Sequence, residues 1–231
     1  MAAGRPTVIV TTTATRIRTM AEADLLKLSQ WLSPGFPVSS YAYSHGLEAE
    51  IVSGRVRDAE GVREWVSGVL AAGAGRTDAI LMLAARRGAE EIDALTDLAR
   101  ALAGSRERLE ETEAQGRALS ETLAGLGLGD GVARPYPVVL GLAARGLELS
   151  DETVAALYLQ AFAGVLVSAA VRFVPLGQAE GQRVLAALHG VIEAVAAEVC
   201  AAGLEEIGTA VFGADLAAME HEGLEVRIFR T

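Results

Sequence analysis

The side chains best suited to metal or nucleophilic chemistry are few and scattered in this 231-residue chain: His45, His189, His221 and one cysteine, Cys200. A tight zinc or nickel site needs ligands that approach one another, which a helix achieves at spacings of three or four residues. No two of these residues have that spacing, and the patterns CxxC, HxxxH and HExxH are absent. We therefore predict no metal site. His189 is expected to be a hydrogen-bonded core histidine, and His221 to belong to an exposed helix end.

The densest group of possible acid–base residues is a run of carboxylates between residues 107 and 113. Its members are Glu107, Glu110, Glu111 and Glu113. At helical spacing such a run is typical of a solvated helix face. One alternative stays open, an enzyme in which Glu48, Glu107 and His45 meet in a cleft, and perturbed pKa values in a measured pocket would favour it. No nucleophile elbow suggests itself, so we predict no catalytic residue.

A glycine-rich stretch from Gly125 to Gly131 alternates glycine in the manner of a nucleotide-binding loop. It does not match GxGxxG, follows a helix and leads into Arg134-Pro-Tyr-Pro, which favours a linker. The P-loop pattern GxxxxGK[ST] is absent from the chain. The sequence therefore predicts no nucleotide hydrolysis and no cofactor.

The amino-acid composition indicates that the secondary-structure elements around these residues are helices. Apolar residues make up 51% of the chain but aromatic residues only 5%, and alanine, leucine and valine favour packed helices over sheet. The formal net charge is −10, which repels phosphate backbones and argues against nucleic-acid binding. A single cysteine and the lack of a hydrophobic signal peptide favour a reducing, cytoplasmic setting.

The chain is organised around a segment with no charge between Val154 and Val171. Ser150 can cap this helix and Pro175 ends it, and a second long apolar helix follows to about Ala202. We predict a buried helical hairpin at the centre of one all-α, bundle-like domain over residues 21–222, with roughly ten helices. A membrane hairpin is disfavoured, because Glu193 and Glu198 would lie at mid-helix in lipid.

Two terminal segments are expected to lie outside this domain. Residues 1–20 show no helical period and are predicted to be a flexible arm. Residues 223–231 carry apolar side chains and arginines together, and so short a segment cannot bury its apolar groups without another surface. We predict that this tail is mobile in the free protein and docks on a partner.

Four stretches, in order, resemble the family of the urease accessory protein UreF. They are Leu32-Ser-Pro-Gly-Phe-Pro-Val-Ser-Ser-Tyr-Ala-Tyr-Ser-His-Gly-Leu-Glu48, Arg106-Glu107 with Gln115-Gly116-Arg117, Ser168-Ala-Ala-Val-Arg-Phe-Val-Pro-Leu-Gly-Gln178, and His221-Glu222 with Arg227-Ile-Phe-Arg-Thr231. The chain departs from the family at Ser39 and Ser40, where two glycines are usual, and at Glu220 and Glu225. These departures affect the expected details of partner docking.

The resemblance implies an all-α, non-catalytic and usually dimeric protein. It would bridge a GTP-hydrolysing nickel chaperone (UreG) and a scaffold (UreD, also called UreH), and so contact the urease apoprotein indirectly. The residues that the resemblance assigns to partner binding are Tyr41, Gly46, Glu48, Arg106, Glu107, Gln115, Gly116, Arg172, Pro175, Gly177, Gln178, His221, Glu222, Arg227, Phe229 and Arg230. A purely structural interaction module is the remaining alternative.

Overall fold

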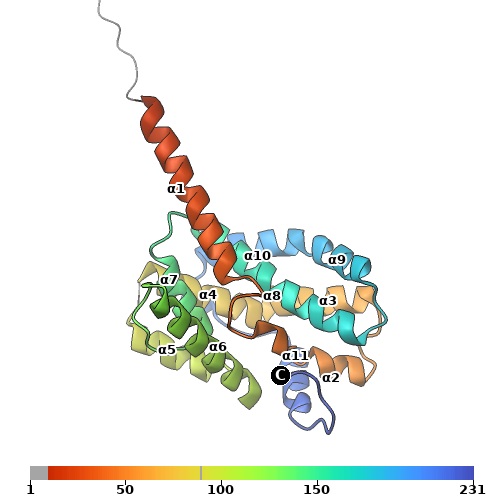
Figure 1. The fold of residues 1–231 in the computed structure, drawn as a ribbon. Coiled ribbons are helices and arrows are strands. Elements are labelled where there is room, and N and C mark those ends of the chain that lie inside the picture. The colour runs from red at the N-terminus through yellow and green to blue at the C-terminus, as the bar shows by residue number, and fades with distance from the viewer. Residues whose placement is uncertain (1–9, 89) are drawn as a thin grey trace, which may run out of the picture.

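The computed structural model describes residues 10–88 and 90–231, and these residues form helices and connecting loops without a strand (Figure 1). The helices are α1 (Val10–Trp31), α2 (Leu47–Val52), α3 (Ala59–Ala72), α4 (Ala74–Arg87), α5 (Ile92–Ala101), α6 (Arg106–Gly125), α7 (Tyr136–Ala144), α8 (Asp151–Phe173), α9 (Gln178–Ala187), α10 (His189–Ala201) and α11 (Phe212–His221). Two short 3₁₀ turns, η1 (Ser40–Ala42) and η2 (Leu204–Glu206), complete the described part. The predicted all-α class with roughly ten helices is confirmed.

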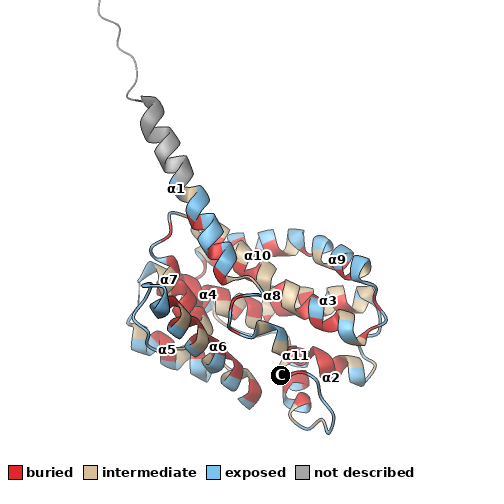
Figure 2. Ribbon diagram, viewed as in Figure 1, coloured by how far each residue is buried: buried red, intermediate tan, exposed pale blue. Residues whose placement is uncertain are grey.

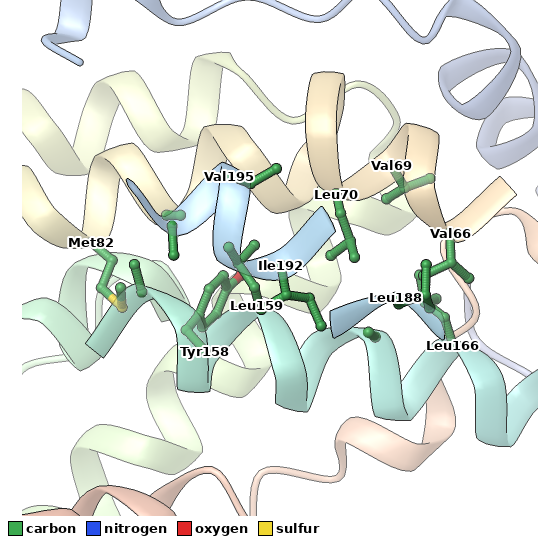
Figure 3. Packing of buried hydrophobic residues seen from close by; sticks show 14 of the residues in the cluster. Val66, Val69, Leu70, Met82, Tyr158, Leu159, Leu166, Leu188, Ile192 and Val195 are labelled. Atoms are coloured by element: carbon green, nitrogen blue, oxygen red, sulfur yellow. The ribbon is translucent and has the colours of Figure 1, made fainter. Parts of the chain in front are cut away.

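Helix α8 lies at the centre and contacts α2, α3, α4, α9 and α10. Ser150 caps it by accepting the Thr153 N–H at 3.1 Å, and the helix ends at Phe173, two residues before Pro175. Figure 3 shows how Leu159 and Leu166 of α8 pack with Leu70 of α3 and Ile192 of α10. Figure 2 colours the chain by burial, and the buried residues lie on the inner faces of these helices.

Two helix boundaries differ from the sequence prediction. Helix α1 begins at Val10, so residues 10–20 are helical and not a structureless arm, while residues 1–9 lie outside the described residues. The second apolar helix is divided into α9 and α10 at Leu188, whose backbone remains helical (φ −83°). His189, just after this division, is exposed, so the prediction of a core histidine is wrong.

Three helical segments are long and apolar enough to cross a membrane by length and composition: Ala59–Arg87, Asp151–Phe173 and Gln178–Ala201. In the described fold they pack against one another, since α8 and α10 each contact α3, α4 and α9 and also contact each other. Burial differs among them: 61% of the most apolar window is buried in the first segment and 33% in the last. The apolar composition of the first two segments is therefore explained largely by the core, and that of the last only in part.

Candidate partner-binding site at the C-terminus

The first motif places Glu48 at the start of α2, through two residues with left-handed backbones. His45 has φ 54° and Gly46 has φ 80°, and α2 begins at the next residue. A Cβ on Gly46 would lie 2.6 Å from the backbone nitrogen of Ala218 in α11. Only glycine permits both this conformation and this approach. The start of α2 thus lies directly against α11, and Glu48 is buried beside the end of α11.

His221, the last residue of α11, joins three helices. Its Nδ1 lies 2.7 Å from Oε2 of Glu107 in α6, and its Nε2 lies 3.0 Å from Oε2 of Glu48 in α2. The side chain is 0% exposed, so the predicted exposed helix end is wrong. Arg227 also pairs with Glu107. The imidazole of His221 therefore bridges the two buried carboxyl groups, and the guanidinium of Arg227 brings a positive charge to Glu107. We call Glu48, Glu107 and His221 the tail anchor.

The tail, residues 223–231, is bound to its own chain. Glu48 accepts the backbone N–H of Ile228 at 2.9 Å and of Phe229 at 3.0 Å. The N–H of Arg230 donates to the carbonyl of Ala42 at 2.8 Å. The prediction of a mobile tail is therefore wrong. Its premise was that an outside surface must bury the apolar groups, but the first motif supplies a buried carboxylate and backbone partners for this segment.

The tail also reaches the end of α8. Phe229 is buried, and its ring centroid lies 5.4 Å from that of Phe173. The guanidinium of Arg172 lies over the Phe229 ring, 5.6 Å from the centroid. Such a contact adds a cation–π attraction to the burial of the ring. The third motif thus contributes Arg172 to the C-terminal site.

A second buried cluster adjoins the tail anchor. His45 Nε2 lies 3.1 Å from Glu111, which also pairs with Arg108 and accepts a hydrogen bond from the Thr231 hydroxyl at 3.1 Å. Burial alone would raise the pKa of Glu111, but Arg108 and His45 outweigh it and lower this pKa to about 2. The pKa of His45 is lowered, mainly by burial and then by Arg108. Gln115 donates to Glu111 at 3.0 Å.

The acidic run of α6 therefore has two faces. Glu107 and Glu111 are four residues apart and buried, whereas Glu110 is exposed and Glu113 pairs with Arg100 near the surface. The prediction of a uniformly solvated face is wrong for the two buried members. An i, i+4 pair beside the family motif was the available signal, since residues at that spacing share a helix face.

The remaining motif residues divide into structural positions and exposed ones. Glu222 accepts the N–H of Arg106 at 2.9 Å at the start of α6 and pairs with its guanidinium at 3.3 Å. A Cβ on Gly116 would lie 1.8 Å from the carbonyl oxygen of Arg134, so glycine lets the loop before α7 pass directly over α6. Tyr41 is exposed on η1, away from this network.

Pro175, Gly177 and Gln178 are exposed and do not join the C-terminal network. Among the described residues the Gln178 side chain makes no hydrogen bond, so it does not satisfy backbone groups freed at the end of α8. We call residues 174–178 the elbow. Val174 and Leu176 of the elbow are buried, whereas the exposure of Pro175 and Gln178 leaves these two side chains free to contact another molecule.

Sequence reasoning missed Ser44, Arg108 and Thr231. The Ser44 N–H donates to the carbonyl of Thr231 at 2.8 Å, and its hydroxyl donates to the same oxygen. Ser44 lies within the first motif, but nothing in the sequence shows that its partner is 187 residues away. Ser39 is the first of the two positions at which glycine is usual in the family. It adopts a left-handed backbone conformation with φ 56°. Glu220 pairs with Arg55 at the surface.

The chemical character of the tail anchor is that of a closed joint. His221 is occupied on both nitrogens by carboxylates, and no substrate-sized opening separates Glu48 from Glu107 because the imidazole lies between them. No group of three or more His, Cys, Asp or Glu side chains that could hold a metal occurs among the described residues. The geometry favours holding the tail in place over carrying out a reaction.

Comparison with known proteins assigns the chain to a family. The family model of UreF matches residues 56–189, which include the Arg106–Arg117 motif and the elbow. A urease accessory protein UreF of Jannaschia sp. is 67% identical over 207 residues, covering 90% of this chain and 94% of the relative. The chain belongs to the UreF family of urease accessory proteins.

More distant relatives carry the same name. A UreF of Cereibacter sphaeroides (strain KD131 / KCTC 12085) is 60% identical, covering 90% of this chain and 99% of its own. A UreF of Rhodopseudomonas palustris is 41% identical, with coverages of 90% and 94%. The UreF family model ends before α11 and the tail, so the contacts of the tail anchor come from the structure and not from that match.

Proposed function

We propose that this UreF-family protein is a non-catalytic, cytoplasmic adaptor in urease maturation. It bridges a UreD/UreH-type scaffold and a UreG-type GTPase, so that nickel reaches the urease apoprotein. Family membership supports the role in urease maturation. The closed tail anchor supports the absence of catalysis, because its histidine and carboxylates are already engaged with one another.

The observation that carries the scaffold-binding part is a cluster of exposed apolar side chains at the C-terminus. Five of the fourteen large apolar side chains that are exposed in the described residues lie between positions 212 and 228. They are Phe212, Leu216, Met219, Val226 and Ile228, which we call the C-terminal apolar set. Positions 212, 216 and 219 recur at helical spacing, so they share one face of α11.

This set is held on a rigid base. The opposite face of α11 is buried against Gly46, and the tail is fixed by Glu48 on either side of the exposed Ile228. Exposed apolar groups on a preorganised surface lose little conformational freedom on binding, which favours affinity. Clustered exposed apolar side chains are also characteristic of interaction sites. We assign this surface to the UreD/UreH-type scaffold.

The elbow is proposed as a separate contact in the same assembly. Gln178 and Pro175 are exposed and outside the C-terminal network, so a partner can reach them without displacing the tail. A homodimer belongs to the proposal as well, and light scattering on the purified protein measures it directly. Adding the protein to a UreG-type GTPase and measuring GTP hydrolysis separates a passive bridge from a modulator.

The test of scaffold binding uses two leucines of nearly equal exposure. Leu216 in the C-terminal apolar set is 58% exposed, and Leu126 at the end of α6 is 56% exposed. We expect Leu216→Ser to weaken binding to a UreD-type scaffold by at least about tenfold while the melting temperature stays unchanged. Leu126→Ser is the matched control and should bind like the original protein. Equal affinity for both variants would contradict the assignment of this surface.

The enzymatic alternative had a specific expectation, a cleft formed by Glu48, Glu107 and His45. The structure joins Glu48 and Glu107 through His221, while His45 pairs with Glu111 instead. No observation in the described residues favours that function over the adaptor.

A further inference from the structure

A cavity beside the second buried cluster is not used by the tail anchor or by the proposed partner surfaces. It lies between the loop after α1 and helices α4, α6, α7 and α8, and ≈ 590 Å³ of space separates its walls, its open mouth included. Only ≈ 50 Å³ of this is free to the centre of a water molecule, so the interior is narrow. A slender group fits such a space, and a nucleotide or other bulky ligand does not.

His45 lines this cavity with an unsatisfied nitrogen. The side chain is 7% exposed, and its Nε2 is engaged by Glu111 at 3.1 Å. The other nitrogen, Nδ1, is buried and has no hydrogen-bond partner among the described residues. With the proton on Nε2, Nδ1 is an acceptor. A buried acceptor without a partner costs free energy, and a ligand with an N–H donor would supply the missing hydrogen bond.

Two more polar groups of the cavity have unused capacity. Asp78 accepts the Tyr158 hydroxyl at 3.0 Å and faces Arg108 at 3.6 Å, both through Oδ2, while Oδ1 accepts no hydrogen bond within the described structure. The Tyr136 hydroxyl likewise has no partner in the described part of the chain. Asp78 and Tyr136 both line the cavity, so residues with unused acceptor capacity border it from α4 and α7 as well as from the loop.

The charges around the cavity do not balance. Two carboxyl groups, Asp78 and Glu111, line the cavity with a single guanidinium, Arg108, which leaves one carboxyl group in excess. Burial raises the pKa of Asp78 despite the nearby Arg108, as expected of a carboxylate short of positive charge. The walls include the rings of Trp31 and Phe162. Aromatic faces attract cations and also accommodate an apolar stem.

We infer that this cavity is a binding site for a slender monocation with N–H donors on a short apolar stem, an alkylguanidinium or alkylammonium group. The N–H donors complement His45 Nδ1, Asp78 Oδ1 and the Tyr136 oxygen, and the single positive charge matches the excess carboxylate. The group can belong to a free small molecule or to a basic side chain of a partner. The inference does not depend on the adaptor function, because the cavity is distinct from the C-terminal apolar set.

The test titrates the full-length protein with n-butylguanidinium chloride and, separately, with n-butylurea at the same ionic strength, with calorimetry as the readout. The two probes share shape and stem, but only the first is charged. We expect saturable one-to-one binding of n-butylguanidinium and at least about tenfold weaker binding of n-butylurea. Equal binding of both probes, or no saturation by about 10 mM n-butylguanidinium, would overturn the inference.

Variants locate the binding. Asp78→Asn removes the excess charge and should weaken n-butylguanidinium binding at least about tenfold. Tyr136→Phe removes a hydroxyl that has no partner in the free protein, so it should weaken binding several-fold without unfolding the chain. Asp97→Asn, on the exposed side of α5, is the control and should leave binding unchanged. Binding that neither Asp78→Asn nor Tyr136→Phe alters would place the probe elsewhere and reject the site.

A competition experiment distinguishes the two sources of the cation. If a partner's basic side chain enters the cavity, n-butylguanidinium will weaken complex formation, and Asp78→Asn will weaken it too. If the natural ligand is a free small molecule, complex formation will be insensitive to both. Leu216→Ser reports on the scaffold surface independently, so failure of the cavity inference and failure of the proposed function give different results.

Discussion

The tail anchor and the elbow come from motifs of the same apparent kind, but the structure treats them in opposite ways. Glu48, Glu107 and His221 come from distant parts of the chain and meet in a buried, hydrogen-bonded joint. Gly177 and Gln178 stay at the surface and make no side-chain contact of that sort. A family motif can therefore mark either residues that form a buried joint or residues that stay at the surface.

The physical distinction is whether a charged group has lost its water. A buried carboxylate needs hydrogen-bond donors and positive charge to offset desolvation, so each member of the tail anchor depends on the others. The exposed elbow side chains, Pro175 and Gln178, remain hydrated and need no internal partner. Variants in the first region should change folding stability, whereas variants in the second should change only association.

The largest effect is expected from His221→Ala. Removing the imidazole leaves Glu48 and Glu107 buried without the group that joins them, which should cost about 3–5 kcal/mol in the free energy of unfolding. Urea unfolding followed by circular dichroism measures this cost. The control is His189→Ala, at an exposed position, which should stay within about 0.5 kcal/mol of the original protein. Comparable losses for the two variants would remove the distinction between anchor and surface.

A pair of glycine substitutions gives the next largest contrast. Gly46→Ala places a Cβ 2.6 Å from a backbone atom of α11 at a left-handed position, and should cost about 3 kcal/mol. Gly177 has φ −69° and open space around the site of a Cβ. It is also the N-cap of α9, where alanine is less favourable than glycine, and this offsets the entropy gain from the unfolded chain, so Gly177→Ala should change stability by no more than about 1 kcal/mol. Thermal unfolding of both variants measures this difference in stability. A stable Gly46→Ala protein would mean that α2 and α11 are not in close contact.

Acidification should weaken the buried cluster beside the tail. The pKa of Glu111 is about 2 in the folded chain against 4.5 for the free group, so below pH 4.5 the unfolded chain binds more protons. Stability from this group is therefore complete above pH 4.5 and is lost as the pH falls toward 2, by an amount on the order of 1–3 kcal/mol. Unfolding free energies measured between pH 6 and pH 2.5 should fall more steeply for the original protein than for Glu111→Gln. Parallel pH profiles would contradict the assigned environment.

The smallest effect on stability is expected from Gln178→Ala. Because this side chain makes no hydrogen bond in the described structure, its loss should change the free energy of unfolding by less than about 0.5 kcal/mol. The same variant should weaken assembly with the scaffold or the GTPase, which co-purification measures. If stability falls while assembly is unaffected, the elbow is a structural element and not a contact.

The helical framework could be predicted from the sequence because its signals are local. The uncharged run from Val154 to Val171 predicts the central helix, and Ser150 caps this helix by accepting the Thr153 N–H at 3.1 Å. The break at Leu188 carries no proline, and no local signal identifies it. Residues 10–20 were predicted to belong to a flexible arm because they lack a clear period, although they form the first half of α1.

The sequence predicted which residues belong to the candidate site, but not how they contact one another. The family motifs identified Glu48, Glu107, His221 and Phe229, but not that the first three form a buried joint or that Ile228 donates to a carboxylate 180 residues earlier. Those contacts depend on how α2, α6 and α11 pack, and a single sequence contains no such information. A tail that is mobile in the free protein, as the sequence predicted, could be deleted at residues 223–231 without loss of stability. The structure instead predicts a loss, because the deletion leaves Glu48 without two of its donors.

Hydrogen exchange of the tail amides tests most directly whether the tail folds onto its own chain. The N–H groups of Ile228 and Phe229 donate to Glu48, and that of Arg230 donates to Ala42, in the protein without any partner. We predict that these three amides exchange at least about a hundredfold more slowly than an unstructured peptide, and that His221→Ala abolishes this protection. Exchange at the unstructured rate in the original protein would show a free tail and contradict the account.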